Sequence, residues 1–183
     1  MEAMTTRTSV SRASLGRLAI AGGAVLVVQA VAAAATKQNT HYAASTGDAL
    51  SDVLLGAGLL LALACVEALR RILSPRVGGL AVAGQAALVV SIAATIAAGH
   101  EVLDAVYIAG TVAWFAGLVA IAVGAWRSGD RGWWPAIPLP LAALVALALA
   151  DAGGAVLLGL AFVVLGARAL RTSSAWPPRI GCT

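Results

Sequence analysis

Charged residues are scarce in this sequence. Asp, Glu, Lys and Arg together make up 11% of its 183 residues, whereas an ordinary soluble domain contains about 25%. A chain with so little charge has too few polar side chains to face water on all sides, which excludes an ordinary soluble domain. Aromatic residues are also few, at 5%, so the apolar content is mostly alanine, leucine, valine and glycine. These side chains suit slender helices that pack closely within lipid.

Cysteine is nearly absent as well. Cys65 stands within an apolar run and Cys182 near the end of the chain, which excludes a disulfide framework and a CxxC metal site. The sequence also has no P-loop, no GxSxG elbow and no HExxH pair, the motifs that mark phosphate-binding, hydrolytic and zinc sites. No cofactor is therefore predicted, and the sequence favours a protein that is not an enzyme.

Six apolar runs occupy most of the chain. About 20 apolar residues in a helix cover a hydrocarbon core of roughly 30 Å, so the sequence predicts an all-α integral membrane protein. We expect a compact bundle of six transmembrane helices, arranged as three hairpins, over residues 18–171. A cytoplasmic segment, residues 1–17, precedes it, and a cytoplasmic tail, residues 172–183, follows it. The predicted helices cover residues 18–35, 53–69, 77–98, 105–126, 133–150 and 155–170.

The basic residues predict the orientation of this bundle. With six spans and the N-terminus in the cytoplasm, eleven of the twelve basic residues lie inside and only Lys37 lies outside, as the positive-inside bias requires. Topology therefore explains the net charge of +4. The sequence has no basic patch interleaved with aromatic residues, so no nucleic-acid partner is predicted. The preference for arginine over lysine is typical of a GC-rich bacterial genome, which predicts a multi-pass protein of the inner (plasma) membrane. The inner residues are Arg7, Arg12, Arg17, Arg70, Arg71, Arg76, Arg127, Arg131, Arg168, Arg171 and Arg179.

The first apolar run permits another interpretation. A basic segment, an apolar stretch and the small residues that end at Ala35 also resemble a cleaved secretory signal peptide. The run is long for such a peptide, which favours a retained helix. Cleavage would leave five helices in the same orientation.

Acidic residues and histidines gather at the predicted outer side. His100 and Asp104 share one helix face, and imidazole with carboxylates can bind a cation or relay protons. The alternative is structural, because an aspartate at a helix start caps free N–H groups and meets the positive end of the helix dipole. Asp52, Asp104 and Asp151 fit that second role, and the identity of any metal stays unknown. The full candidate set is His100, Glu101, Asp104, His41, Asp48, Asp52 and Asp151.

One carboxylate and two side-chain amides lie within the predicted spans. Glu67 is an intramembrane carboxylate and therefore a functional candidate, but Arg71 follows one helical turn later, which favours an ion pair near the interface. Gln29 and Gln85 lie deeper, where side-chain amides join helices by hydrogen bonds or line a polar path.

Small residues form seams along the predicted helices. Such seams allow two helix backbones to approach closely, either within the chain or against a partner. With no catalytic pattern present, they favour a membrane-embedded assembly or accessory subunit that binds a membrane-protein partner or further copies of itself. The alternative is a small transporter or ligand-binding protein with an outward-facing site, and a third is an outer-face hydrolase. The fourth-helix seam is Gly110, Ala113, Gly117, Ala120 and Gly124, and the sixth helix adds Gly159 and Gly166.

Overall fold

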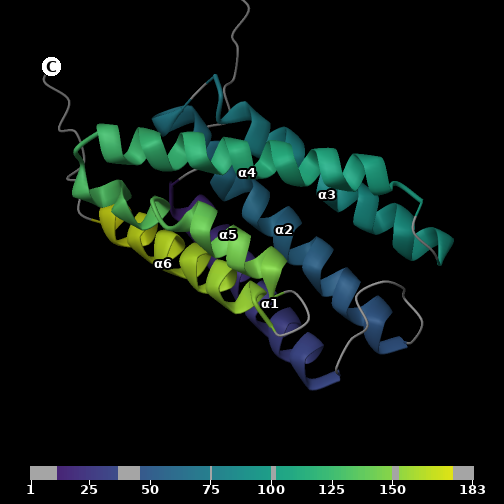
Figure 1. Ribbon diagram of the computed structural model, residues 1–183. Helices are drawn as coiled ribbons and strands as arrows, with labels where there is room; N and C mark the ends of the chain where they lie inside the picture. The colour runs from purple at the N-terminus through teal and green to yellow at the C-terminus, as the bar shows by residue number, and fades with distance from the viewer. Residues whose placement is uncertain (1–11, 37–45, 75, 100–101, 150–152, 175–183) are drawn as a thin grey trace, which may run out of the picture.

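The computed structural model describes residues 12–36, 46–74, 76–99, 102–149 and 153–174. This described part of the chain is all-helical and has no strand (Figure 1), which confirms the predicted helical class. Its elements are α1 (Arg12–Thr36), α2 (Thr46–Leu73), α3 (Gly79–Ala98), α4 (Asp104–Arg127), the 3₁₀-helix η1 (Arg131–Ala136), α5 (Leu139–Ala148) and α6 (Ala155–Ser174).

Four of the described helices are long and apolar enough to cross a membrane. The candidate spans are Ser14–Ala35, Leu50–Leu73, Gly79–Ala98 and Asp104–Arg127. The remaining apolar stretch, Gly132–Ala148, is shorter, and α6 carries Arg168 and Arg171 near its end.

The fifth predicted helix, residues 133–150, is not one continuous helix. The structure divides it into η1 and an α5 of 10 residues, which is about 15 Å long. Proline is the cause, because a ring in place of the N–H removes a hydrogen-bond donor and restricts the preceding residue. Pro135 lies inside η1, Pro138 is the N-cap of α5, and Pro140 follows in its first turn.

The second helix begins earlier than predicted. It starts at Thr46 rather than at residue 53, so Asp52 lies in its second turn and not at its start. Asp52 is therefore not the N-terminal cap that the sequence favoured. The stretch before it contains Ala49 and Leu50, both strong helix formers, which allow the helix to extend backward.

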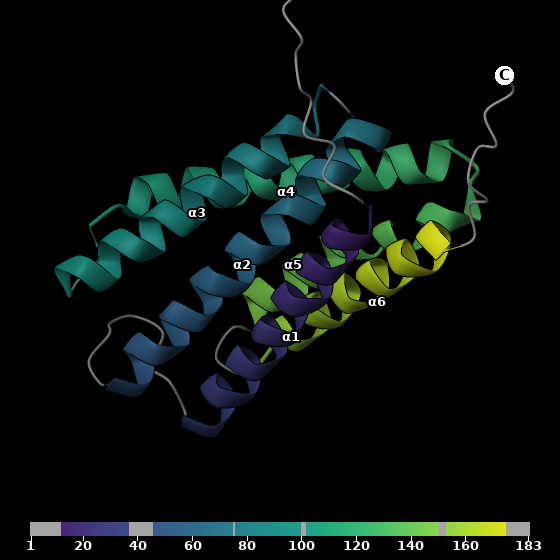
Figure 2. The same cartoon turned by 180° about the vertical axis from the view of Figure 1, so that it is seen from behind.

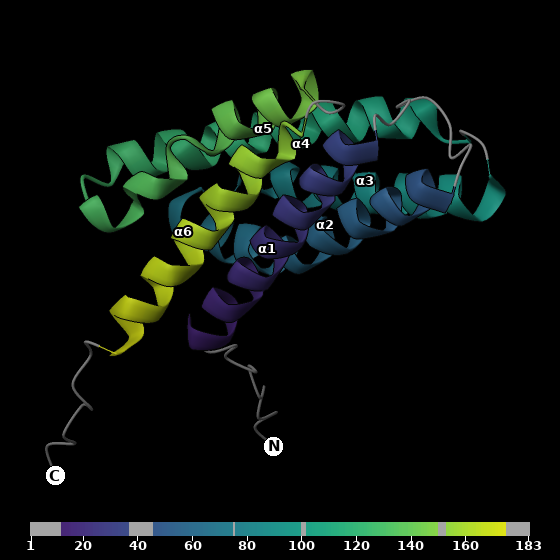
Figure 3. The same ribbon diagram turned by 90° about the horizontal axis from the view of Figure 1, so that it is seen from below.

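The helices form two antiparallel pairs that are joined by the other two helices. α1 lies beside α6, and α3 lies beside α4 (Figures 1 and 2). α2 packs against both α1 and α3, while α5 packs against α6 and α4. Seen from below, the start of α1 lies next to the end of α6 (Figure 3). The largest fully buried side chains of the described residues come from all six α-helices and are Phe162, Leu26, Leu118, Ile121, Leu139, Gln85 and Val66.

Glycines bring α1 and α6 into backbone contact. A β-carbon on Gly16 would lie 2.9 Å from the carbonyl oxygen of Gly166, and one on Gly166 would lie 2.5 Å from the carbonyl oxygen of Gly16. Two helical turns along, Gly23 and Gly159 meet in the same reciprocal way. Only residues without a side chain fit at these four positions, so the glycines set the distance between the two helices.

The glycines of the fourth-helix seam face neighbours within the chain. Gly110 lies against α3, Gly117 against α3, and Gly124 against the end of α2, while Ala113 and Ala120 are half-buried. This face of α4 is therefore used for internal packing and is not available to a partner. Gly110 meets Gly84 and Ala87, Gly117 meets Ala81, and Gly124 meets Leu73.

We expect Gly23→Ala to destabilise the protein. Its new β-carbon would meet the Gly159 carbonyl oxygen and lie 2.9 Å from Val163 Cγ2, and such overpacking costs about 1–3 kcal/mol. Gly56→Ala is the matched control, because its β-carbon would lie 3.5 Å from Ile92 Cγ2 and alanine gains up to about 1 kcal/mol in a helix. Circular dichroism during denaturation in detergent measures both free energies of unfolding. Equal effects would contradict the described contact.

Candidate functional site

Most of the predicted outer cluster lies outside the described residues. His41, His100, Glu101 and Asp151 fall in segments that the structure does not describe. The same holds for the side chain of Asp48, although its backbone belongs to α2. The convergence of these residues into one outer site therefore stays a prediction.

Asp104 and Asp52 are the two members of that cluster whose side chains are described. Asp104 is exposed and occupies the first position of α4, after the N-cap Leu103. No side-chain capping hydrogen bond is present at this helix start, so the contribution of Asp104 there is its charge near the positive end of the helix dipole. The described residues contain no group of three or more His, Cys, Asp or Glu side chains placed to hold a metal ion.

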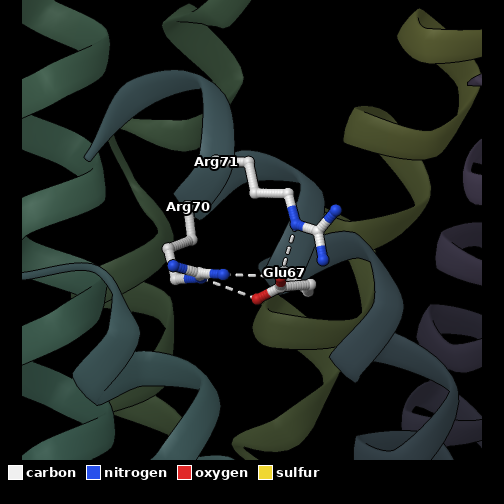
Figure 4. A network of polar contacts seen from close by, with 3 residues as sticks. All are labelled: Glu67, Arg70 and Arg71. Carbon is white, nitrogen blue, oxygen red and sulfur yellow. Dashed lines mark hydrogen bonds and ion pairs between the residues drawn. The ribbon is translucent and has the colours of Figure 1, made fainter. Parts of the chain in front are cut away.

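Glu67 lies between two arginines near the end of α2 (Figure 4). Arg70 Nε donates to Glu67 Oε2 at 2.6 Å, and Arg70 Nη2 donates to Glu67 Oε1 at 2.6 Å. Arg71 Nε also donates to Oε1, at 2.5 Å. The pairing of Glu67 with Arg71 was predicted, whereas the two-point contact with Arg70 was missed, although its spacing of one turn is also visible in the sequence.

This arrangement fits a structural role better than proton transfer. Both carboxylate oxygens of Glu67 already accept hydrogen bonds from cations, and such charge-assisted bonds favour the ionised form. The group remains a cationic cluster with one net positive charge, because two guanidinium groups surround one carboxylate.

Gln29 joins α1 to α2 by a buried hydrogen bond. Its Nε2 donates to Ser51 Oγ at 2.9 Å, as expected for an amide that links helices. Its Oε1 is buried and accepts no hydrogen bond from the described residues. Ser51 was missed as its partner, because the sequence does not indicate which turn of α2 faces α1.

Gln85 joins α3 to α2 in a similar way. Its Nε2 donates to the Leu59 carbonyl oxygen at 2.6 Å, and the side chain is fully buried. Its Oε1 and the indole Nε1 of Trp114 on α4 are both buried without a hydrogen-bond partner among the described residues. An unpaired buried acceptor costs about 1–3 kcal/mol, which offsets much of the gain from the bond to Leu59.

A cavity of about 150 Å³ lies where several arginine-bearing helix ends meet. Its walls come from the start of α1, the end of α2, the end of α6, and the first half of η1 with its N-cap Asp130. The lining is mostly apolar, and Asp130 and Arg168 are its ionisable members apart from the thiol of Cys65. Four separate segments form this cavity, so no local pattern in the sequence predicts it.

Several described arginines share this end of the bundle. The cavity joins the start of α1 to the ends of α2 and α6, and the contact between Gly124 and Leu73 places the end of α4 beside them. We call this the arginine-bearing end. Its described arginine side chains are Arg17, Arg70, Arg71, Arg76, Arg127, Arg168 and Arg171.

Comparison with protein-family models, with curated protein sequences and with solved structures finds no match for this chain. The fold and the chemistry of its surfaces are therefore the two sources of functional inference. The candidate functional surfaces are the outward faces of the helices and the arginine-bearing end.

We expect Gln85→Met to change the free energy of unfolding by less than about 1 kcal/mol. The bond to Leu59 is lost, but the unpaired Oε1 is removed too, and the two effects are similar in size. Gln85→Ala is the control, because it leaves a cavity and should cost about 2 kcal/mol or more. Denaturation in detergent, followed by circular dichroism, compares the two variants. A large loss for Gln85→Met would show that the amide has a further partner.

Proposed function

We propose that this chain is a six-span protein of a bacterial inner membrane, with both ends in the cytoplasm. The apolar length of α1 to α4 supports the membrane setting. The gathering of seven described arginines at one end of the bundle supports the orientation, because the positive-inside bias places such an end in the cytoplasm.

α5 and α6 fit a six-span arrangement if η1 adds to the length of α5 and the arginines of α6 reach the headgroups. The stretch Gly132–Ala148 combines η1 with α5, and its kinked path extends its reach beyond α5 alone. α6 has 20 residues, or about 30 Å. The exposed side chains of Arg168 and Arg171 reach headgroups by snorkelling.

The role that the geometry supports best is that of a membrane-embedded accessory subunit, and the outward face of α4 is the observation that carries it. Ala105, Ala109 and Ala116 are exposed on this face, interspersed with exposed valines. Small residues are enriched where membrane helices contact each other. The outward face of α6 differs, because it presents Leu157, Leu160 and Val164, and none of the described alanines of α6 is exposed.

The first turns of α4 strengthen this proposal. Residues 104–109 are exposed on every side of the helix, and Gly110 is the first buried position. α5 is too short to cover them, and α4 extends beyond its end (Figures 1 and 2). A helix of another protein or of a second copy fits along this part of α4. The outward-facing transporter and the outer-face hydrolase depend on residues outside the described segments and stay predictions.

The proposed orientation is tested by single cysteines on either side of α4, in a chain that carries Cys65→Ala and Cys182→Ser. Val102→Cys lies before α4 and Ser128→Cys after it, and both positions are exposed. A membrane-impermeant maleimide should label Val102→Cys in intact cells and Ser128→Cys only after the membrane is opened. The reverse pattern would contradict the cytoplasmic arginine-bearing end, and equal labelling of both would contradict a span between them.

The subunit role is tested by photocrosslinking from α4. A benzophenone maleimide attached to Ala116→Cys, in the same cysteine-free background, should give a discrete adduct in native membranes. Leu160→Cys on the outward face of α6 is the matched control and should give only diffuse lipid adducts. An adduct of twice the protomer mass identifies a homo-oligomer, and one of another mass identifies a separate partner. No discrete adduct from Ala116→Cys would contradict the subunit role.

A further inference from the structure

The cavity at the arginine-bearing end has no part in the subunit role. Its apolar walls include Leu15, Leu69, Ile72 and Leu165, contributed by α1, α2 and α6. Its volume is about 150 Å³, which is enough for an apolar group of about six carbon atoms. The walls therefore suit a segment of hydrocarbon chain.

The charges around the cavity favour a negatively charged group at its mouth. Arg168, near the end of α6, lines the cavity. Arg171 is exposed at the same end of α6, and Arg17 is exposed near the start of α1. Asp130 also lines the cavity, and its Oδ1 accepts the N–H of Gly132 at 2.7 Å, which caps η1. Among the described side chains at these helix ends, guanidinium groups outnumber carboxylates, and this positive net charge attracts an anionic ligand.

We infer that the cavity binds one acyl chain of an anionic membrane lipid, with the lipid headgroup among Arg17, Arg168 and Arg171. This inference rests on the membrane setting of the proposed function. In that setting the arginine-bearing ends of the helices lie at headgroup level, in the leaflet that is rich in anionic lipid. A lipid held there fills the space between α1, α2 and α6 that these helices leave open.

The test uses the full chain in phosphatidylcholine vesicles that contain a small fraction of photoreactive lipid. The probe carries a diazirine on its acyl chain and has either a phosphatidylglycerol or a phosphatidylcholine headgroup. After illumination, mass spectrometry of peptides locates the adducts. The lining segments, residues 65–72 and 165–169, are compared with the outward residues Leu157, Leu160 and Val164 of the same α6.

We expect the phosphatidylglycerol probe to label the lining segments more strongly than the outward residues, and about fivefold more strongly than the phosphatidylcholine probe does. Ala68→Leu fills the cavity and should abolish this labelling, whereas Ala64→Leu, one turn earlier and outside the lining, should preserve it. Arg168→Gln should reduce the labelling by phosphatidylglycerol to about the phosphatidylcholine level, whereas Arg127→Gln should not.

Two results would overturn the inference and leave the membrane setting intact. The first is strong labelling of the outward residues with no excess at the lining segments, which indicates bulk lipid contact alone. The second is equal labelling of the lining segments by both headgroups, which removes the anionic preference. A lack of labelling at every outward residue would instead contradict the membrane setting itself.

Discussion

Close contact between glycine backbones is the constraint on which this bundle depends. In a membrane, helices gain no hydrophobic energy by leaving lipid for one another, so dispersion forces and weak Cα–H···O contacts must hold them together. Both forces require short distances. Gly16 and Gly23 provide them on α1, and Gly159 and Gly166 provide them on α6. The same principle recurs where Gly110 and Gly117 of α4 meet α3, so both helix pairs have the same kind of contact.

The arginine-bearing end holds the ion pairs of Glu67, the cap of η1 and the cavity. Glu67 holds Arg70 and Arg71 in one orientation, while Asp130 caps the 3₁₀-helix next to the cavity. Each acid is therefore engaged in local structure, and the surrounding arginines supply the net charge. α1 also matters here, since it forms one wall of the cavity and contributes the buried Gln29 to the contact with α2. Cleavage of α1 as a signal peptide would remove both.

Much of the fold follows from the sequence, because long apolar runs determine helices by themselves. The seam of α4 was visible as well, since Gly110, Gly117 and Gly124 recur on one face. The sequence did not show what this seam packs against, because the choice between α3 and another protein depends on which helix faces meet in space. The prolines marked the start of α5 but not its short length, which depends on how Pro135 and Pro138 bend the chain. The cavity unites Leu15, Cys65, Trp133 and Leu165, and no sequence spacing connects such distant residues.

The pairing of the first helix with the last has a consequence for biosynthesis. α1 precedes α6 by more than 100 residues in the chain, so its glycine face meets its partner only after α6 has been translated. Until then α1 can pack against α2 alone, through Gly22 and Gly58. The side of α1 that packs against α6 therefore stays open until α6 has been made. A chain that terminates before α6 would leave that face of α1, with Gly16 and Gly23, uncovered.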